Sequence, residues 1–280
     1  GTALDGAHGH VMQFISDWED AEEEFDILRE TSRKTGAKGT FTLIPIENPS
    51  AGMNENPDLW RDQLKRIETA QAEGLDIRGQ VISRPIGILM GHIATMSPFY
   101  KRPSYVAVAH LPPAERAAKL KDPARKAQIL AEENDNPHIF VQLLSTNFGA
   151  MYPMENPIEY LPQNENSVAA RAEAEGRDPE EWLYDFLAES DSQNLIYIPA
   201  TSKSKDKIAE LLKHPHTVEA LGDGGAHVGS ICDTSANLFV LTKWVFDEKL
   251  FSLEDGIRKI TREPAEFFSF TDRGTLAEGM

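Results

Sequence analysis

The sequence has one cysteine, no long apolar run and a deficit of basic residues. The single thiol, Cys232, excludes an intramolecular disulfide and favours a cytoplasmic location. No stretch approaches the roughly 20 apolar residues that a bilayer-spanning helix needs. Lys and Arg number 28 against 45 Asp and Glu, a formal charge of -17. Because nonspecific binding to nucleic acid or anionic membrane relies on basic residues, we expect neither as a partner.

The remaining composition is that of an ordinary globular protein. Of the 280 residues, 40% are hydrophobic and 26% are charged, enough for one large domain or two small ones. The acidic run Asp17–Glu24 is interpreted as a solvated helix face. The chain starts at Gly1 and stops at Gly279-Met280, so we expect truncation at both ends.

Apolar runs alternate with amphipathic stretches, which predicts βα units around a parallel sheet. Five strands are expected, at 10–16, 40–46, 77–82, 195–199 and 218–221. Helices are expected from Asp20 to a stop at Gly36, over 57–72, through 208–212, over 235–246 and over 253–268.

Residues 86–190 break this alternation with several prolines and few strand patterns. Pro113 suits the first position of a helix, and Asp178 followed by Pro179 suits a helix start. We interpret the region as a helical insertion or lid over an active-site face; an elaboration that serves packing alone is nearly as well supported.

The most distinctive local feature is Gly222-Asp223-Gly224-Gly225, with His227 close behind. An apolar strand delivers Asp223 to a strand end, and the glycines allow a sharp turn and close ligand approach. A carboxylate there can act as a general base, a metal ligand or both. A turn in which Asp223 caps a backbone amide is an equally open reading on composition alone.

Several segments together resemble the N-acyl-D-amino-acid deacylases, D-aminoacylase-like members of amidohydrolase family 3. The resembling segments are Leu221–Val228 with Ile231–Ser235, Ile82–Gly87, Asn164–Ser167 through Asp178-Pro179, and Asp272–Met280. The resemblance implies an α/β fold, a partial (β/α)8 TIM-like barrel of about strands 4 to 8 with a helical insertion. Residues 1–272 would be the barrel fragment, and 273–280 the start of a truncated β domain.

The same resemblance implies a zinc hydrolase that cleaves the C–N amide bond of N-acyl, D-configured amino acids. Asp223 would bind or face the metal and pass a proton from water to the leaving nitrogen. His227 would contact the small-molecule substrate. Ser83 and Arg84 are further candidates, because a guanidinium at a strand end can pair with a substrate carboxylate; an ion pair between Arg84 and a neighbouring loop acid is equally open.

The sequence departs from the superfamily in its histidines. Where strands five and six usually end in metal-binding histidines, this chain has Pro45-Ile46 and Arg84-Pro85. The pairs His8/His10 and His214/His216 precede strands, which places them at the face opposite the catalytic one. Cys232 is interpreted as a small buried filler, since no adjacent base is apparent.

The departures keep a second function open, a divergent barrel without the usual metal site. Such a protein would act on another amide or an ester, or bind a small molecule. A third possibility, an unrelated phosphate-binding barrel, has little support because no Gly-rich loop with a basic residue is present.

Overall fold

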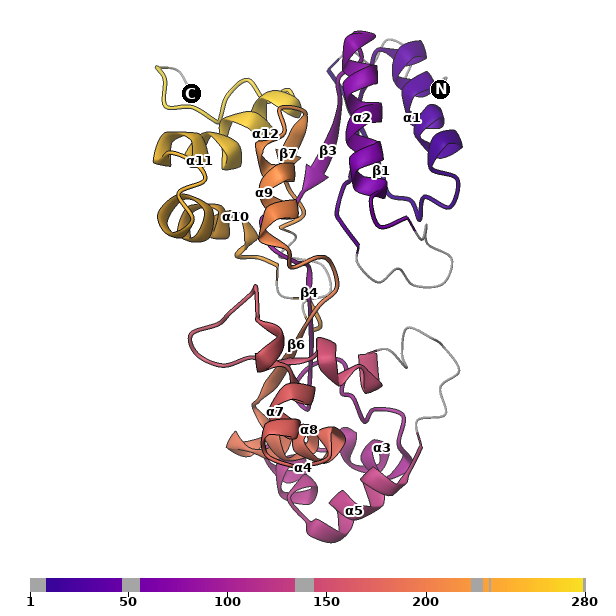
Figure 1. Cartoon of the computed structure of the whole chain (residues 1–280), viewed down its shortest axis with the longest axis vertical. Coiled ribbons are helices and arrows are strands. Elements are labelled where there is room, and N and C mark those ends of the chain that lie inside the picture. The colour runs from indigo at the N-terminus through magenta and orange to yellow at the C-terminus, as the bar shows by residue number, and fades with distance from the viewer. Residues whose placement is uncertain (1–8, 47–55, 134–143, 223–228, 232, 279–280) are drawn as a thin grey trace. The chain divides into compact units, whose positions relative to one another are not determined.

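The computed structural model describes residues 9–46, 56–133, 144–222, 229–231 and 233–278 (Figure 1). The chain divides into two compact units. The first comprises 1–84, 201–224 and 233–280, and the second comprises 85–200 and 225–232. Within the described residues, no helix has the length and apolar character that crossing a membrane requires.

A parallel sheet of four strands forms the centre of the first unit. Its order is β1 (Val11–Phe14), β2 (Lys38–Thr42), β3 (Ile77–Val81) and β7 (Thr217–Glu219). β3 and β7 are neighbours although the chain builds the second unit between them. The expectation of a parallel sheet is therefore confirmed, and the part of the chain that is described contains no closed barrel.

The helices of the first unit pack on this sheet or on one another, and the first three bury apolar faces at the spacing that the sequence predicts. They are α1 (Ala21–Thr35), α2 (Leu59–Ala72), α9 (Lys205–Lys213), α10 (Ala236–Phe239), a π-helical stretch (Val240–Asp247), α11 (Leu253–Ile260) and α12 (Arg262–Phe267). Asp20 caps α1 by accepting from the Glu23 amide, and Gly36 ends it in the left-handed conformation at φ 73°. Both helix signals are confirmed.

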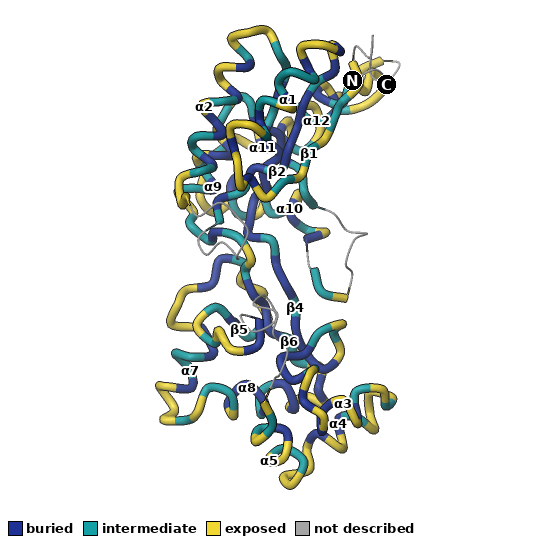
Figure 2. The backbone as a smooth tube through the Cα atoms, turned by 90° about the vertical axis from the view of Figure 1, so that its right-hand side faces the viewer, coloured by how far each residue is buried: buried dark blue, intermediate teal, exposed yellow. Residues whose placement is uncertain are grey.

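The second unit is built around an antiparallel sheet of three short strands. Its order is β4 (Gly87–Gly91), β6 (Leu195–Pro199) and β5 (Tyr152–Pro153). β4 and β6 run alongside each other in Figure 1, and most of β4 is buried (Figure 2). The helices of this unit are α3 (Pro103–Ala109), α4 (Pro113–Leu120), α5 (Pro123–Ala131), α7 (Val168–Ala174) and α8 (Pro179–Ala188), with 3-10 turns at Phe148–Ala150, Asn164–Asn166 and Ser190–Ser192.

The prediction that residues 195–199 form a strand is confirmed, but their assignment to the parallel sheet is wrong. β6 pairs antiparallel with β4, Gly87 opposite Pro199 and Gly91 opposite Leu195. A Cβ on Gly87 would lie 2.3 Å from Cε2 of Tyr197, so glycine is needed for this approach. The terminal glycines of β4 resemble turn residues, which hides the strand and therefore the partner of β6. The number of parallel βα strands described is four, where five were expected.

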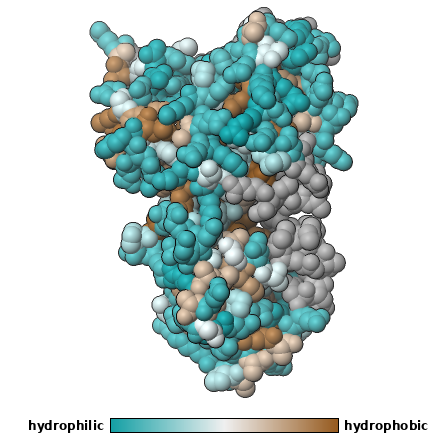
Figure 3. Space-filling model, viewed as in Figure 1, coloured by the Kyte–Doolittle hydropathy of each residue, from teal (hydrophilic) through white to brown (hydrophobic). Residues whose placement is uncertain are grey.

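The helix starts predicted in the second unit are confirmed. Pro113 is the first residue of α4, and Asp178 accepts hydrogen bonds from the amides of Glu180 and Glu181 ahead of α8. An apolar and aromatic core joins these helices to β4 and β6, with Phe99, Tyr184 and other residues buried in it. Hydrophilic residues cover most of the face shown in Figure 3, as the high charge content predicts.

Candidate functional site

The carboxyl ends of β3 and β7 meet at one edge of the parallel sheet. The pairing continues beyond β7, because the Ala220 amide donates to the Val81 carbonyl at 2.9 Å. The chain leaves β3 through Ser83 and Arg84, and leaves β7 through Leu221 toward the Asp223 segment. In parallel sheets this edge is where binding and catalytic groups gather.

Arg84 lies three residues after the end of β3, and none of its surface is exposed. Its Nη1 lies 3.4 Å from Oδ1 of Asp233, and its Nη2 donates to Oγ of Ser235 at 3.2 Å. Asp233 is itself almost completely buried. The sequence left open whether Arg84 forms an ion pair with a loop acid, and the structure shows this pair, with Asp233 as the acid. Contact between Arg84 and a substrate carboxylate stays a prediction.

Ser83 is buried and held at three points. Its Oγ donates to the Ala236 carbonyl at 2.6 Å, and its amide donates to Oε1 of Glu219 at 3.2 Å. Its carbonyl accepts from Nε1 of Trp244 at 2.7 Å. These bonds fix the turn after β3 against β7 and the helices that follow. A substrate contact by Ser83 also stays a prediction.

Glu219, the last residue of β7, is a buried titratable group at this edge that was not predicted from the sequence. It is buried, and the cost of placing its charge away from water raises its pKa from 4.5 to about 8. Hydrogen bonds from Ser83 and the charges of Lys259 and Arg84 act in the opposite direction, lowering the pKa. At neutral pH the carboxyl is therefore mainly protonated. An acid inside the otherwise apolar strand Val218–Leu221 was the available signal.

The candidates Asp223, His227 and Cys232, together with His8 of the pair His8/His10, lie outside the described residues. The described chain just before Asp223 is unusual, since Leu221 has a φ of 64°. Non-glycine residues in this left-handed region are uncommon, and such conformations gather at functional sites.

The described histidines of the two sequence pairs lie at the amino edge of the sheet. His10 precedes β1, and His214 and His216 lie between α9 and β7. Nε2 of His214 lies 3.2 Å from Oε1 of Glu68. Burial and the neighbouring His214 lower the pKa of His216. These contacts agree with a structural role at this face.

The described residues do not fit a metal centre. No three His, Cys, Asp or Glu side chains within them lie together as a set of ligands. The chain after β2 passes through Pro45-Ile46, and the chain after β3 through Arg84, whose guanidinium carries no lone pair for a metal. A zinc site is consequently retained only as an expectation for the protein as a whole.

Comparisons with known proteins find likeness in solved structures only. No family model and no curated protein matches the chain. An N-acyl-D-glutamate deacylase from Bordetella bronchiseptica, solved with zinc and a phosphonate inhibitor, is 18% identical with a TM-score of 0.45; the match covers 95% of this chain and 42% of that one. A D-aminoacylase described as defining a novel subset of amidohydrolases is 13% identical with a TM-score of 0.46, over 95% and 44%. This chain spans less than half the length of these structures. Sequence identities below 20% and TM-scores below 0.5 do not assign the chain to their family.

Proposed function

We propose that the protein is an amidohydrolase that cleaves the C–N bond of N-acyl, D-configured amino acids, with Asp223 as its proton-transfer group. One observation supports this most directly. β7, which precedes the glycine-flanked Asp223 in the sequence, ends at the carboxyl edge of a parallel sheet, and the buried turn of Ser83 and Arg84 leaves β3 at the same edge. The sequence resemblance supplies the reaction class and the substrate.

In this proposal Asp223 takes a proton from water as the oxygen adds to the amide carbon. The C–N bond then breaks, and the carboxyl group returns the proton to the leaving nitrogen. The network of Arg84, Asp233, Ser83 and Glu219 holds the edge from which the Asp223 segment departs. The sequence resemblance implies zinc, but the described residues offer no metal-binding group, so the proposal assigns no step to a metal.

Hydrolysis of N-acetyl-D-amino acids, with the L-enantiomers as comparison, tests this proposal on the whole protein that contains these residues. Asp223→Asn is expected to lower the rate by about 10²- to 10⁴-fold and to leave the fold intact. Asp206→Asn is the control, because Asp206 is an exposed acid on α9. Full activity in Asp223→Asn would refute the assignment.

The second candidate, a divergent barrel without the usual metal site, is favoured by the strand ends Pro45-Ile46 and Arg84-Pro85. Metal analysis of the purified whole protein separates the two. A stoichiometric divalent ion that is required for D-amide hydrolysis supports the first, whereas metal-independent ester or amide turnover supports the second.

A further inference from the structure

A cavity of about 160 Å³ lies in the first unit, where β1 and β2 end and α2 begins. Its walls include the buried rings of Trp18, Phe41 and Trp60. Trp18 and Phe41 meet edge to face, with centroids 5.0 Å apart. An apolar protein cavity of about 150 Å³ is enough to bind benzene. The space therefore suits a group the size of one aromatic ring.

The cavity wall also contains buried polar atoms without partners. Gln63 is 1% exposed, and neither Nε2 nor Oε1 of its amide has a hydrogen-bond partner among the described residues. The same is true of Nε1 of Trp60. Trp60 and Gln63 are three residues apart on α2, so they lie on one helix face. Because buried polar groups in native proteins are nearly always satisfied, these two donors and one acceptor are the groups with which a bound polar ligand would pair.

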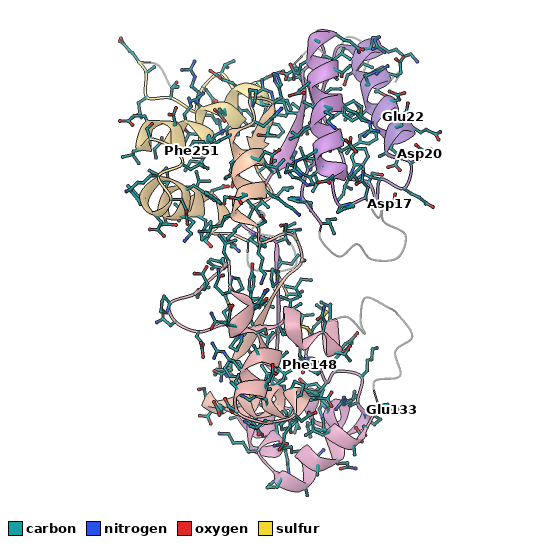
Figure 4. The ribbon with its side chains drawn as sticks, in the orientation of Figure 1. Asp17, Asp20, Glu22, Glu133, Phe148 and Phe251 are labelled. Carbon is teal, nitrogen blue, oxygen red and sulfur yellow. The ribbon has the colours of Figure 1, made fainter. Side chains whose placement is uncertain are left out.

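The one charged side chain among the described lining residues is an acid, and the nearby guanidinium of Arg61, 4.2 Å from the Trp60 ring centroid, is paired with Asp58 and Glu210. Asp17 is an exposed lining residue, and Asp20 and Glu22 lie close by at the amino end of α1 (Figure 4). No Lys, Arg or His is found among the described lining residues. Trp18 is held in the left-handed region at a φ of 59°, a conformation that costs free energy and is typical of functional sites.

We propose that this cavity binds a small neutral molecule in which a ring-sized apolar group carries a carboxamide. The ring lies among Trp18, Phe41 and Trp60. The carboxamide carbonyl accepts from Nε2 of Gln63 or Nε1 of Trp60, and its NH2 donates to Oε1 of Gln63. The inference is independent of the proposed hydrolase activity, because its test measures binding and not turnover.

Benzamide is the probe, and the chain labelled with 5-fluorotryptophan is the reporter. The protein has four tryptophans, of which Trp18 and Trp60 line the cavity while Trp182 and Trp244 lie elsewhere. Fluorine NMR is expected to show saturable shifts of the Trp18 and Trp60 resonances only, with a Kd on the order of 1 mM for so small a ligand. Benzoate is expected to bind at least about tenfold more weakly, because it brings a charge next to Asp17. Absence of saturation, or equal shifts at all four tryptophans, would overturn the proposal.

Variants separate recognition of the amide from occupation of an apolar space. Gln63→Leu is expected to lower benzamide affinity about tenfold and to leave toluene binding unchanged. Gln128→Leu, on an exposed position of α5, is the matched control and should bind both as the native chain does. Trp60→Phe removes one donor together with part of the ring system, so it provides a second test if Gln63→Leu fails to fold, with benzamide affinity compared with toluene affinity in the same variant. Native benzamide affinity in a folded Gln63→Leu or Trp60→Phe variant would show that these groups do not recognise the amide.

Discussion

Each of the two units contains a buried titratable side chain whose neutral form is favoured by burial, Glu219 in the first and His92 in the second. In the first unit, desolvation raises the pKa of Glu219 to about 8. In the second, desolvation lowers the pKa of His92 to about 3, with a smaller contribution from Arg116. An acid and a base thus respond in opposite directions to the same cost of burying charge. The first unit should lose stability as pH rises, and the second as pH falls.

The units differ more in the charges that they bury. Arg84 and Asp233 form an ion pair in the first unit with almost no exposed surface. The comparable pair of the second unit, Arg102 with Glu180, has a carboxylate side chain that is 25% exposed. A buried charge that loses its partner cannot be solvated by water instead. Removing one partner should therefore destabilise the first unit more than the second.

Breaking these pairs gives the largest expected effect. Asp233→Asn should lower the free energy of unfolding of the first unit by about 3 to 5 kcal/mol, because it removes the ion-pair partner of an arginine that has no exposed surface. Glu180→Gln is the matched change in the second unit and should cost clearly less, because water reaches that carboxylate. Urea denaturation followed by circular dichroism measures both. Equal losses would show that burial does not decide the difference.

Glu219→Gln tests the pH response of the first unit. The folded pKa of about 8 exceeds the unfolded value of 4.5, so the stability that neutral Glu219 contributes is fully present below pH 4.5 and is lost as pH rises through about 8. At 1.36 kcal/mol per pKa unit this amounts to roughly 3 kcal/mol between pH 5 and 8. Glu219→Gln should remove this decline in urea denaturation at successive pH values. A wild-type decline that persists in the variant would assign it to other groups.

His92→Gln tests the opposite response in the second unit. The folded pKa of about 3 is below the unfolded value of 6.5, so stability is fully present above pH 6.5 and is lost as pH falls toward 3. Nδ1 of His92 lies 3.2 Å from the Tyr105 hydroxyl, among aromatic rings that exclude water. Between pH 6.5 and 5 the wild type should lose roughly 2 kcal/mol that the variant does not lose. Amide hydrogen exchange in α3 and α8 measures this loss, and parallel pH curves for the two proteins would contradict it.

Local signals in the sequence predicted much of this structure, and non-local contacts account for what they did not. Asp20, Gly36 and Asp178 act within a few residues of themselves, so their roles at helix ends could be predicted. The partner of β6 could not, because strand pairing depends on a segment more than a hundred residues away. The same holds for the candidate site. The position of Arg84 at a strand end could be predicted from the sequence, whereas its contact with Asp233 depends on the folded structure.

The pKa of Glu219 is a second property that the sequence alone could not predict. Its neighbours in sequence mark a strand, but its pKa depends on how completely the packed structure excludes water from one carboxyl group. Burial of that kind is a property of the assembled sheet and helices. The one trace that it leaves in the sequence is an acid among apolar residues.

The smallest expected effects come from a matched pair of helix caps, one in each unit. Ser252 accepts from the Asp255 amide at 3.0 Å at the start of α11, and Ser167 accepts from the Ala170 amide at 3.2 Å at the start of α7. Replacing either serine by alanine should cost about 1 kcal/mol, because one amide of the first helical turn loses its acceptor. Ser167 is buried whereas Ser252 is exposed, so water can replace the lost bond only in the first unit. Thermal denaturation should therefore show a larger loss for Ser167→Ala than for Ser252→Ala, and the reverse order would mean that solvent access does not set the cost of a lost cap.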